Sequence, residues 1–455
     1  RWADAAEIIR DRAMAAENDE RRAALLLEVA RAYAGPIEDM FGAVQQYEEV
    51  LGIVPGQDGA VGDLINLSSH GEVSEAIEVV LRPQLEQLGR FEDLAQVLRN
   101  RIGHVEDPVD KARRVEELVE LCNDRLSDAG AAYQSNLALL EVAEGEALDR
   151  ALDRGMKLAA QLEMLDSFAE HCGRLASADG RENSARGSLG LAAATALYNL
   201  LAQPEQAITL LDSLLESGVS SVAMCDALET FAQEQSQHTT VVRALEERTR
   251  LPDADDLAGL LVRLGDARTN TGDTDGAIDA FREALQEDGT VQGAVEGIRG
   301  LADAMEPSEI PSDGLDTLSQ AYQATDSVEG LIFVSRARLR KVDDPASALG
   351  HQQDLARLQD RATGASPESL EAWGAVLGAD ADHGEALERV LEVGTTLEQG
   401  ARVADILVAA VSKAREDGRV YGKTALAAGR LFVETLKDSA RAAEVLAALF
   451  EEVPG

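Results

Sequence analysis

The feature that most constrains the fold is a helical apolar period that continues through almost the whole sequence. Apolar residues recur at positions i, i+3, i+4 and i+7, as they do at Leu257, Leu260, Leu261 and Leu264. The alternation of apolar and polar residues that is typical of strands is not found over the length of a strand. The pattern predicts an all-α chain, an α-α superhelix built as a solenoid of antiparallel helical hairpins.

An internal repeat supports this architecture. The segment from Arg1 to Ala13 realigns with the segment from Arg90 to Ile102, which is a shift of 89 positions. At the same shift, the segment from Ile37 to Leu51 falls on the segment from Leu126 to Leu140. A match that continues across several helices indicates that a whole block of structure is repeated.

A shorter element recurs along the rest of the chain, with a polar turn, an alanine, and a large apolar residue about one helical turn later. Its alanines are Ala43, Ala132, Ala207, Ala277, Ala348 and Ala442. They lie 70 to 94 positions apart, which leaves room for about two or three hairpins in each interval. We therefore expect repeat blocks over residues 1–89, 90–180, 185–250, 251–306, 312–365 and 366–455, joined in one continuous solenoid.

Length and charge narrow the classes of function. A chain of 455 residues is longer than one hydrophobic core supports, which fits an extended array. Its 83 acidic residues against 42 basic ones give a net charge of -41, which disfavours nucleic acid and anionic membrane surfaces as partners. No stretch has the roughly 18 consecutive apolar residues that span a bilayer, so we expect no membrane insertion.

The three cysteines, Cys122, Cys172 and Cys225, are too few and too scattered for a disulfide framework. Each lies in a helical pattern, which predicts buried thiols and a reducing, cytoplasmic location. The sequence opens at Arg1 without a charged and apolar leader, so no signal peptide is expected in it.

Three short motifs resemble sites of chemistry but lack parts of them. The segment from Gly418 to Leu426 contains Gly-Lys-Thr without the loop length or the preceding strand of a phosphate loop. The segment from Thr271 to Asp279 lacks the first acidic ligand and the late glutamate of a calcium loop. His171 and Cys172 have no two further ligands at metal-site spacing. We predict helix starts at the first two, one exposed and one buried residue at the third, and no catalytic residue, metal or cofactor.

Local signals predict where helices begin and end. Turns with Asp, Ser or Pro mark helix starts in DPVDK, QPEQA, DPASA and SPESL, while Gly272 and Gly400 mark helix ends. The longest irregular stretches expected are Ala176 to Gly190 and Glu306 to Gly314. Aromatic residues at core-like positions of the expected helices are Trp2, Phe91, Phe281, Trp373 and Phe432.

The segment from Ala258 to Val291 carries small and large side chains at spaced positions of two helices. These are Leu264, Gly265, Gly272, Ala277, Phe281 and Ala284. At these positions the segment resembles a tetratricopeptide repeat, whose two antiparallel helices pack against each other through such small and large side chains. Arg268 and Gly289 stand where the family usually has an aromatic residue and a proline. Weaker copies extend the resemblance over most of the chain.

The resemblance implies a protein-binding groove lined by the first helix of each hairpin. Carried over copy by copy, it places in that groove Val262, Arg263, Asp266 and Asn270 of the best copy and Glu28, Arg31, Glu117, Glu120 and Asn123 of earlier copies. The acidic residues among them, together with the net charge, predict a protein or peptide partner with a basic surface. Family members that clamp a C-terminal carboxylate use lysine and asparagine where this chain has Val262 and Asp266.

Two other classes of function stay open. The chain could be a structural subunit of a larger assembly or filament that packs through its convex face or its ends, because Leu449, Phe450 and Val453 close it with an apolar face. An enzyme has no motif in its favour and rests only on the fact that chemistry can be grafted on any fold. The sequence favours a scaffold that holds a peptide or protein in its concave face.

Overall fold

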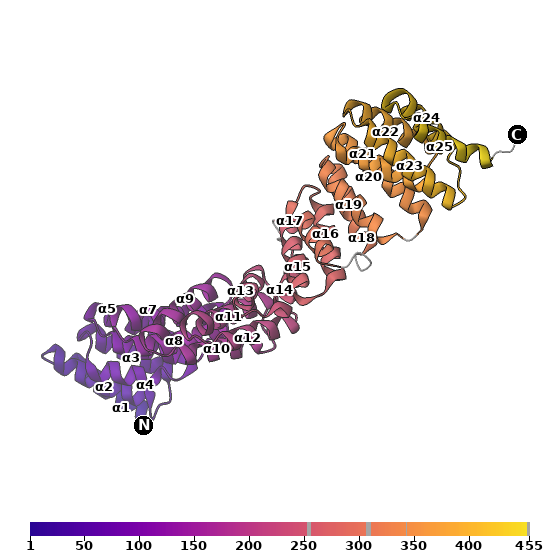
Figure 1. Cartoon of the computed structure of the whole chain (residues 1–455). Coiled ribbons are helices and arrows are strands. Elements are labelled where there is room, and N and C mark those ends of the chain that lie inside the picture. The colour runs from indigo at the N-terminus through magenta and orange to yellow at the C-terminus, as the bar shows by residue number, and fades with distance from the viewer. Residues whose placement is uncertain (253–255, 306–310, 343, 453–455) are drawn as a thin grey trace. The chain divides into compact units, whose positions relative to one another are not determined.

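The computed structural model describes residues 1–455 except 253–255, 306–310, 343 and 453–455. The described residues form twenty-five α-helices and three short π-helical segments, and they contain no strand. The all-α fold predicted from the helical period is therefore confirmed. The chain divides into two compact units, residues 1–236 and 237–455, and each is a succession of helical hairpins (Figure 1).

The helices of the two units have the following bounds. The first unit contains α1 (Trp2–Met14), α2 (Asp19–Ala34), α3 (Met40–Ile53), α4 (Asp58–Leu67), α5 (Gly71–Leu88), α6 (Phe91–Ile102), α7 (Pro108–Glu120), η1 (Leu121–Arg125), α8 (Ala129–Val142), α9 (Gly145–Gln161), α10 (Leu165–Ser177), α11 (Asn183–Thr195), η2 (Ala196–Leu200), α12 (Pro204–Glu216) and α13 (Val222–Glu234). The second contains α14 (His238–Arg250), α15 (Leu257–Thr271), α16 (Thr274–Glu287), α17 (Gln292–Ala304), α18 (Ser312–Ala324), α19 (Val328–Lys341), α20 (Pro345–Thr363), α21 (Pro367–Ala379), α22 (Gly384–Thr396), α23 (Gly400–Glu416), α24 (Gly422–Leu431), η3 (Phe432–Leu436) and α25 (Ser439–Glu452).

Helices that follow one another in sequence pack on each other within each unit. In the first unit α2 packs on α3, α7 on α8 and α10 on α11, and in the second α15 packs on α16 and α20 on α21. Because each helix packs mainly on its neighbours in the chain, every hairpin adds its own layer of apolar core. This is the organisation of a helical-repeat solenoid.

The 89-residue repeat is visible in the helix boundaries. The starts of α1, α2 and α3 return 89 positions later as the starts of α6, α7 and α8. The correspondence ends after the third helix, because α4 and α9, and then α5 and α10, begin at other intervals. The repeated block therefore consists of three helices, and Glu28 of α2 corresponds to Glu117 of α7.

A single residue in the left-handed conformation makes the tight turn of most hairpins. At eleven helix starts in the described residues it lies two positions before the helix begins, as Gly272 does before Thr274. Glycine, which adopts this conformation without steric cost, is used at only three of these places. The eleven residues are Gly56, Gly89, Gly272, Glu38, Ser127, Glu163, Ala202, Ser236, Asp326, Glu398 and Lys437. Gly272 is a helix end as predicted, but Gly400 is not, because it begins α23 and Glu398 makes the turn.

The residue after the left-handed one closes the preceding helix through its backbone. Arg90 N–H donates to the carbonyl oxygen of Leu85 at 2.8 Å, and Met164 N–H donates to that of Ala159 at 2.8 Å, which is the Schellman arrangement. After η1 the corresponding donor, Asp128 N–H, bonds to the carbonyl oxygen of Cys122, which is one residue earlier in the helix than the usual acceptor. A π-helical turn holds one extra residue, so the same cap closes a wider helix end.

Most of the expected helix starts are confirmed. The helices α7, α12, α20 and α21 begin at the prolines of the four predicted turns, and the preceding Asp or Ser side chain caps three of them. The expected irregular stretch from Ala176 to Gly190 is wrong, because α11 already begins at Asn183. Its last glycine serves packing, since a Cβ on Gly190 would overlap the Leu214 side chain. Of the other stretch, residues 306–310 lie outside the described residues.

The aromatic residues expected in the core divide into two groups. Phe281, Trp373 and Phe432 are buried as predicted. Trp2 is 61% exposed and Phe91 is only partly buried, so the prediction is wrong for Trp2 and partial for Phe91. In the described part of the chain α1 packs mainly on α2, and Arg10 of α1 also pairs with Glu49 of α3. Trp2 lies outside these contacts and stays open to solvent.

Phe281 is the centre of the best-matching repeat. Its ring lies against two glycines, Gly265 of α15 and Gly297 of α17, and a Cβ on either of them would overlap the ring. Ala277, one turn earlier on α16, is fully buried. Small residues around one large aromatic ring allow three helices to approach closely, as the sequence pattern predicted.

A carboxylate in the second unit satisfies the indole of its buried tryptophan. Trp373 Nε1 donates to Asp360 Oδ2 at 2.9 Å, and Arg389 Nε donates to the same oxygen at 2.8 Å. The hydroxyl of Ser369 donates to the other carboxylate oxygen. Asp360 of α20 thereby connects α21 and α22, and the buried polar groups are paired.

Candidate functional site

The nine residues that the repeat pattern places in a groove lie on first helices of their hairpins, in two separate groups. The first unit holds Glu28 and Arg31 on α2, Glu117 and Glu120 on α7, and Asn123 on η1; the second unit holds Val262, Arg263, Asp266 and Asn270 on α15. Each group therefore lies within its own compact unit.

The group on α15 forms a helix surface. Arg263, Asp266 and Asn270 are exposed, and Val262 is partly buried. The Val262 side chain packs toward α17, where a Cβ on Gly293 would lie 2.8 Å from Val262 Cγ1. Partial desolvation raises the pKa of the Asp266 carboxyl above its ordinary value. All four residues lie outside the hollows described below.

Of the two candidate residues on α2, Arg31 is bound to another helix of the first unit. Arg31 Nε donates to Asp63 Oδ2 of α4 at 2.7 Å, and the Tyr47 hydroxyl donates to the same oxygen at 3.2 Å. Burial, followed by the charge of Asp63, raises the pKa of Tyr47 well above its ordinary value. Arg31 thus serves the packing of α2 against α4, and Glu28 is exposed beside it.

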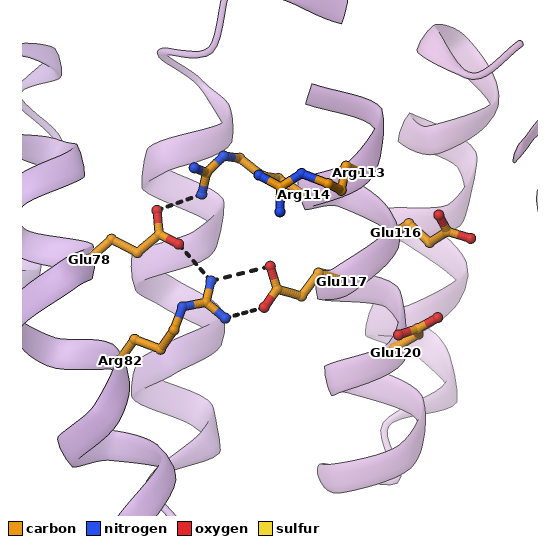
Figure 2. Close-up of a pocket in the computed structure, with 7 residues that line it drawn as sticks. All are labelled: Glu78, Arg82, Arg113, Arg114, Glu116, Glu117 and Glu120. Carbon is orange, nitrogen blue, oxygen red and sulfur yellow. Dashed lines mark hydrogen bonds and ion pairs between the residues drawn. The ribbon is translucent and has the colours of Figure 1, made fainter. Parts of the chain in front are cut away.

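Glu117 and Glu120 line two adjacent hollows of the first unit. One is polar and has a volume of about 420 Å³. Its lining residues are Glu78, Arg82, Arg113, Arg114, Glu116, Glu117 and Glu120 (Figure 2). Figure 2 shows Arg82 and Arg114 converging on Glu78, while Glu116 and Glu120 extend away from them.

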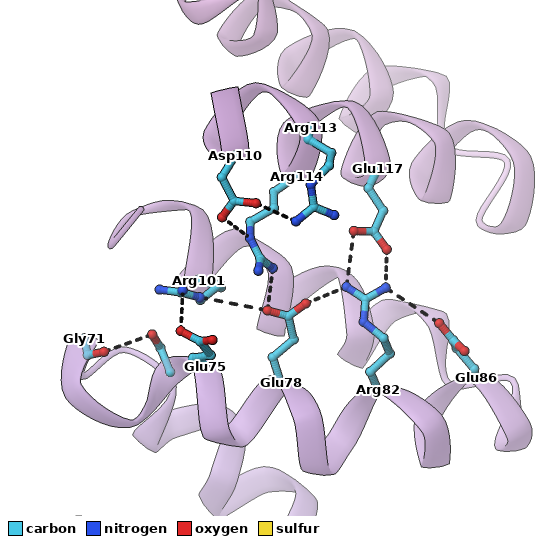
Figure 3. A network of polar contacts seen from close by, with 11 residues as sticks. Gly71, Glu75, Glu78, Arg82, Glu86, Arg101, Asp110, Arg113, Arg114 and Glu117 are labelled. Atoms are coloured by element: carbon cyan, nitrogen blue, oxygen red, sulfur yellow. Dashed lines mark hydrogen bonds and ion pairs between the residues drawn. The ribbon is translucent and has the colours of Figure 1, made fainter. Parts of the chain in front are cut away.

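The polar hollow is built around a buried carboxylate. Glu78 of α5 is almost inaccessible to solvent, and it accepts from Arg82 Nη2 at 2.6 Å and from Arg114 Nη1 at 2.6 Å (Figure 3). Arg101 of α6 approaches it at 3.9 Å and also pairs with Glu75 at 3.0 Å. Side chains of α5, α6 and α7 therefore meet at the Glu78 carboxylate, and three guanidinium groups surround its negative charge.

Arg82 extends this network to the predicted site. Its two terminal nitrogens donate to the two carboxylate oxygens of Glu117, in the fork geometry that arginine forms with carboxylates. The bond to Glu117, reinforced by Glu78, raises the pKa of Arg82 above its ordinary value, so its charge is permanent. On the other side of α7, Arg150 Nε donates to Glu116 at 3.1 Å and Arg154 lies 3.5 Å from Glu120.

The second hollow, which we name the acidic cleft, has an apolar floor and a volume of about 470 Å³. The floor consists of Phe91, Leu94, Leu98 and Leu121, and the rim carries Glu86, Glu117, Glu120, Asp124 and Arg125. Four carboxylates thus face one guanidinium around an apolar centre. The Arg125 guanidinium carbon lies 5.6 Å from the centre of the Phe91 ring, which fixes this cation above the floor.

The π-helical segment η1 shapes this cleft. It continues α7 from Leu121 to Arg125, and its wider turn places Leu121 in the floor and Asp124 and Arg125 on the rim. Cys122 of the same turn faces the core and is buried. Asn123 is exposed and its Nδ2 donates to Asp124 Oδ1 at 2.8 Å. A π-helical turn inside a helix often marks a functional position.

The sequence predicted two residues of the cleft and missed its basic and apolar members. Glu117 and Glu120 were predicted as groove residues, but their pairing with Arg82 and Arg154 was not. The sequence signals for the network are four-residue spacings, of Glu78, Arg82 and Glu86 on α5 and of Asp110 and Arg114 on α7, which predict pairs within each helix and none between helices.

The motifs considered for chemistry have structural roles. Lys423 N–H and Thr424 N–H at the start of α24 donate to Asp382 Oδ1 at 3.0 and 3.2 Å, so an internal carboxylate caps the helix of the Gly-Lys-Thr motif. Asp273 caps α16 in the same way through Gly276 N–H. His171 is partly buried, so the expectation of an exposed side chain is wrong. Its Nδ1 lies 3.1 Å from Arg174 Nη2.

No helix in the described part of the chain is both long and apolar enough to cross a bilayer. The described residues also contain no group of three or more His, Cys, Asp or Glu side chains that could hold a metal ion. Cys122, Cys172 and Cys225 form no disulfide, and all three are buried, as predicted.

Residues 260–289, which form most of α15 and α16, match the family model of the tetratricopeptide repeat. A comparison with curated proteins gives no match. The solved structure of Naa15/Naa10 bound to HypK-THB is 13% identical with a TM-score of 0.28, over 95% of this chain and 69% of that chain. The C-terminal part of a TPR repeat-containing protein from Cytophaga hutchinsonii is 13% identical with a TM-score of 0.24, over 58% of this chain and 96% of that chain.

Proposed function

We propose that this chain, a tetratricopeptide-like helical-repeat protein, is a scaffold that binds another protein and that a basic segment of the partner docks in the acidic cleft. The proposal rests on one observation: the acidic cleft combines an apolar floor with a rim of four carboxylates and one guanidinium. Protein-binding clefts combine such a desolvated centre with charged residues at the edge.

The cleft is preorganised for this task. Glu117 is held in place by Arg82, so little side-chain entropy is lost when it meets a cation of the partner. Glu86, Glu120 and Asp124 are exposed and add charge at the edge of the cleft. The volume of about 470 Å³ accommodates one or two large apolar side chains on the floor.

The net charge of the chain acts at longer range. A charge of -41 produces a negative potential that attracts a basic partner before contact. This attraction is screened over about 8 Å at physiological ionic strength, so association slows as salt is added. Contact with the apolar floor does not depend on salt in this way, so part of the affinity persists at high salt.

A labelled amphipathic peptide of lysine and leucine at helical spacing tests the proposal by fluorescence anisotropy. The test variant combines Glu120→Lys with Asp124→Lys, which reverses rim charges and leaves the Arg82 pair with Glu117 intact. The matched control combines Asp149→Lys with Glu170→Lys, which adds the same charge on α9 and α10, outside the cleft. We expect the affinity to fall at least tenfold in the test variant and less than threefold in the control. Equal losses in both would show that only the net charge matters.

The alternative of a structural subunit has one observation in its favour. Trp2, Ile8 and Met14 of α1 and Phe41 of α3 are each more than half exposed. Apolar side chains of this size on one end of a unit are available for packing against another subunit. The side chains of Leu449 and Phe450, and residue Val453, on which the sequence argument rested, lie outside the described residues. Static light scattering of the chain across a concentration series tests this alternative.

A further inference from the structure

The second unit contains a hollow whose charge is opposite to that of the acidic cleft. It lies between α17 and α19 and has a volume of about 330 Å³. Three arginines line it, Arg299 from α17 and Arg336 and Arg340 from α19, around a floor that includes Ile332 and Phe333. We name it the arginine hollow. Asp303 and Glu329 also line it, which leaves an excess of one positive charge in a chain of net charge -41.

The end of α19 is the source of this charge, with four basic residues in its last six positions. Arg338 Nη2 donates to Asp316 at 2.6 Å, and Lys341 Nζ donates to Ser312 at 2.9 Å, so both serve the packing of α19 on α18. Arg336 and Arg340 make no hydrogen bond or ion pair with any residue that the structure describes. Both are exposed, and both point into the hollow.

The absence of a counter-ion has a cost within the helix itself. Arg336 and Arg340 stand four residues apart on one face, where like charges destabilise a helix. Several other arginines of this unit pair with an acid of a neighbouring helix, as Arg357 pairs with Glu385 and Arg402 with Glu371. An anion supplied from outside the chain would remove this repulsion.

Arg299 gives the hollow a third guanidinium with a fixed orientation. Its guanidinium carbon lies 5.0 Å from the centre of the Phe333 ring, so the planar group is held over the aromatic floor. Asp303 is 3.9 Å from Arg299 Nε, which is beyond hydrogen-bond distance. The ring thus orients Arg299, which also hydrogen-bonds with the Tyr322 side chain, so this guanidinium adds a fixed positive charge to the wall of the hollow.

We infer that the arginine hollow binds an acidic polypeptide segment, with carboxylates on Arg336 and Arg340 and a neighbouring apolar side chain on Ile332 and Phe333. Guanidinium groups bind carboxylates through two parallel hydrogen bonds, which suits aspartate and glutamate side chains. The apolar floor favours a polypeptide over a free inorganic anion. The net charge of the chain repels a long polyanion such as nucleic acid, while a short segment needs to contact only the local positive charge.

This site is independent of the proposed function in the first unit, because its ligand has the opposite charge and its residues lie on α17 and α19. Peptide selection tests it. A library of blocked octapeptides, acetylated and amidated so that no terminal carboxylate contributes, carries a central leucine with the flanking positions randomised. The library is selected on the intact chain and on a variant that combines Arg336→Gln with Arg340→Gln. The matched control combines Lys413→Gln with Arg430→Gln, which removes the same charge from exposed positions of α23 and α24.

We expect the parent chain and the control to select a group of peptides rich in aspartate and glutamate, apart from the basic peptides held by the acidic cleft, and the test variant to lose the acidic group. The best acidic peptide should bind the test variant at least tenfold more weakly than the parent, and the control within twofold. A third variant with Arg336→Lys and Arg340→Lys keeps both charges and should bind at least threefold more weakly, because lysine lacks the fork. Equal acidic content on parent and test variant, or tighter binding of single-stranded DNA than of the selected peptide, would overturn the inference.

Discussion

Arg82 of α5 donates hydrogen bonds to both carboxylate oxygens of Glu117 of α7, and the same guanidinium donates to the buried Glu78 one turn earlier on its own helix. One arginine therefore joins the predicted groove residue to a structural carboxylate. Because the acidic cleft shares Glu117 with the polar hollow, the spacing of α5 and α7 sets the shape of both. The site and the stability of the first unit are thus coupled through this cation.

The two carboxylates that Arg82 meets on α5 allow a matched test of that coupling. Glu78→Gln removes a buried charge and leaves Arg82, Arg101 and Arg114 without their common partner, so we expect the unit to lose about 2 kcal/mol. Glu86→Gln removes a side chain that is 51% exposed and 3.8 Å from Arg82, so we expect a loss below about 0.5 kcal/mol.

Hydrogen–deuterium exchange of the α5 and α7 amides measures both effects locally. Faster exchange in the Glu78 variant alone is the expected result. If the two variants exchange alike, Glu78 is not the centre of the network.

Two of the three glycines of α17, Gly297 and Gly300, should respond oppositely to substitution by alanine. Gly297→Ala places a methyl group against the Phe281 ring, which Gly265 holds from the other side, so we expect a loss of about 1–3 kcal/mol. Gly300→Ala meets no atom within 4 Å, so the alanine should stabilise the helix by about 0.5–1 kcal/mol. Urea unfolding of the intact chain, followed by circular dichroism, gives the sign of each change. A stable Gly297 variant would mean that the ring has room to move.

The sequence predicted the fold well because the helical period and the packing of small on large residues are local properties. The period gave the all-α class, and prolines gave the first residues of α7, α12, α20 and α21. Glycine was an unreliable guide, since Gly190 and Gly400 lie inside or at the start of helices. The repeat needs close approach at some positions and a left-handed turn at others, and glycine satisfies either need.

The candidate site was predicted less completely because its properties depend on contacts between helices. The repeat pattern identified Glu117 and Glu120, but the partners Arg82 and Arg154 lie about 35 positions away on neighbouring hairpins. The π-helical turn η1 has no signal in the local sequence, although it decides that Leu121 lines the cleft. The role of Trp2 was mispredicted for a similar reason, since burial depends on which helices cover α1.

The left-handed turn residues predict an unusual effect of glycine. Ala202 has a φ of 53°, where an L-residue with a Cβ is disfavoured by about 1–2 kcal/mol. Ala202→Gly should therefore stabilise the chain by about 0.5–1 kcal/mol. The control is Ala138→Gly at an exposed position inside α8, which should destabilise it by about 1 kcal/mol. Both are measured by urea unfolding, and the same sign for both would contradict the turn assignment.

Buried acids of the first unit make its stability depend on alkaline pH. Burial raises the pKa of the Cys172 thiol from 9.0 to about 12, and burial also raises the pKa of Tyr47. Above about pH 9 the unfolded chain releases these protons while the folded chain retains them, so the free energy of unfolding falls as pH rises. The stabilisation is fully present below that pH and is lost progressively toward pH 12. We expect the urea midpoint to decrease between pH 8 and pH 11 and to decrease less in Cys172→Ala, whose packing loss is measured separately at pH 7. A midpoint with the same pH dependence in parent and variant would show that Cys172 ionises without unfolding.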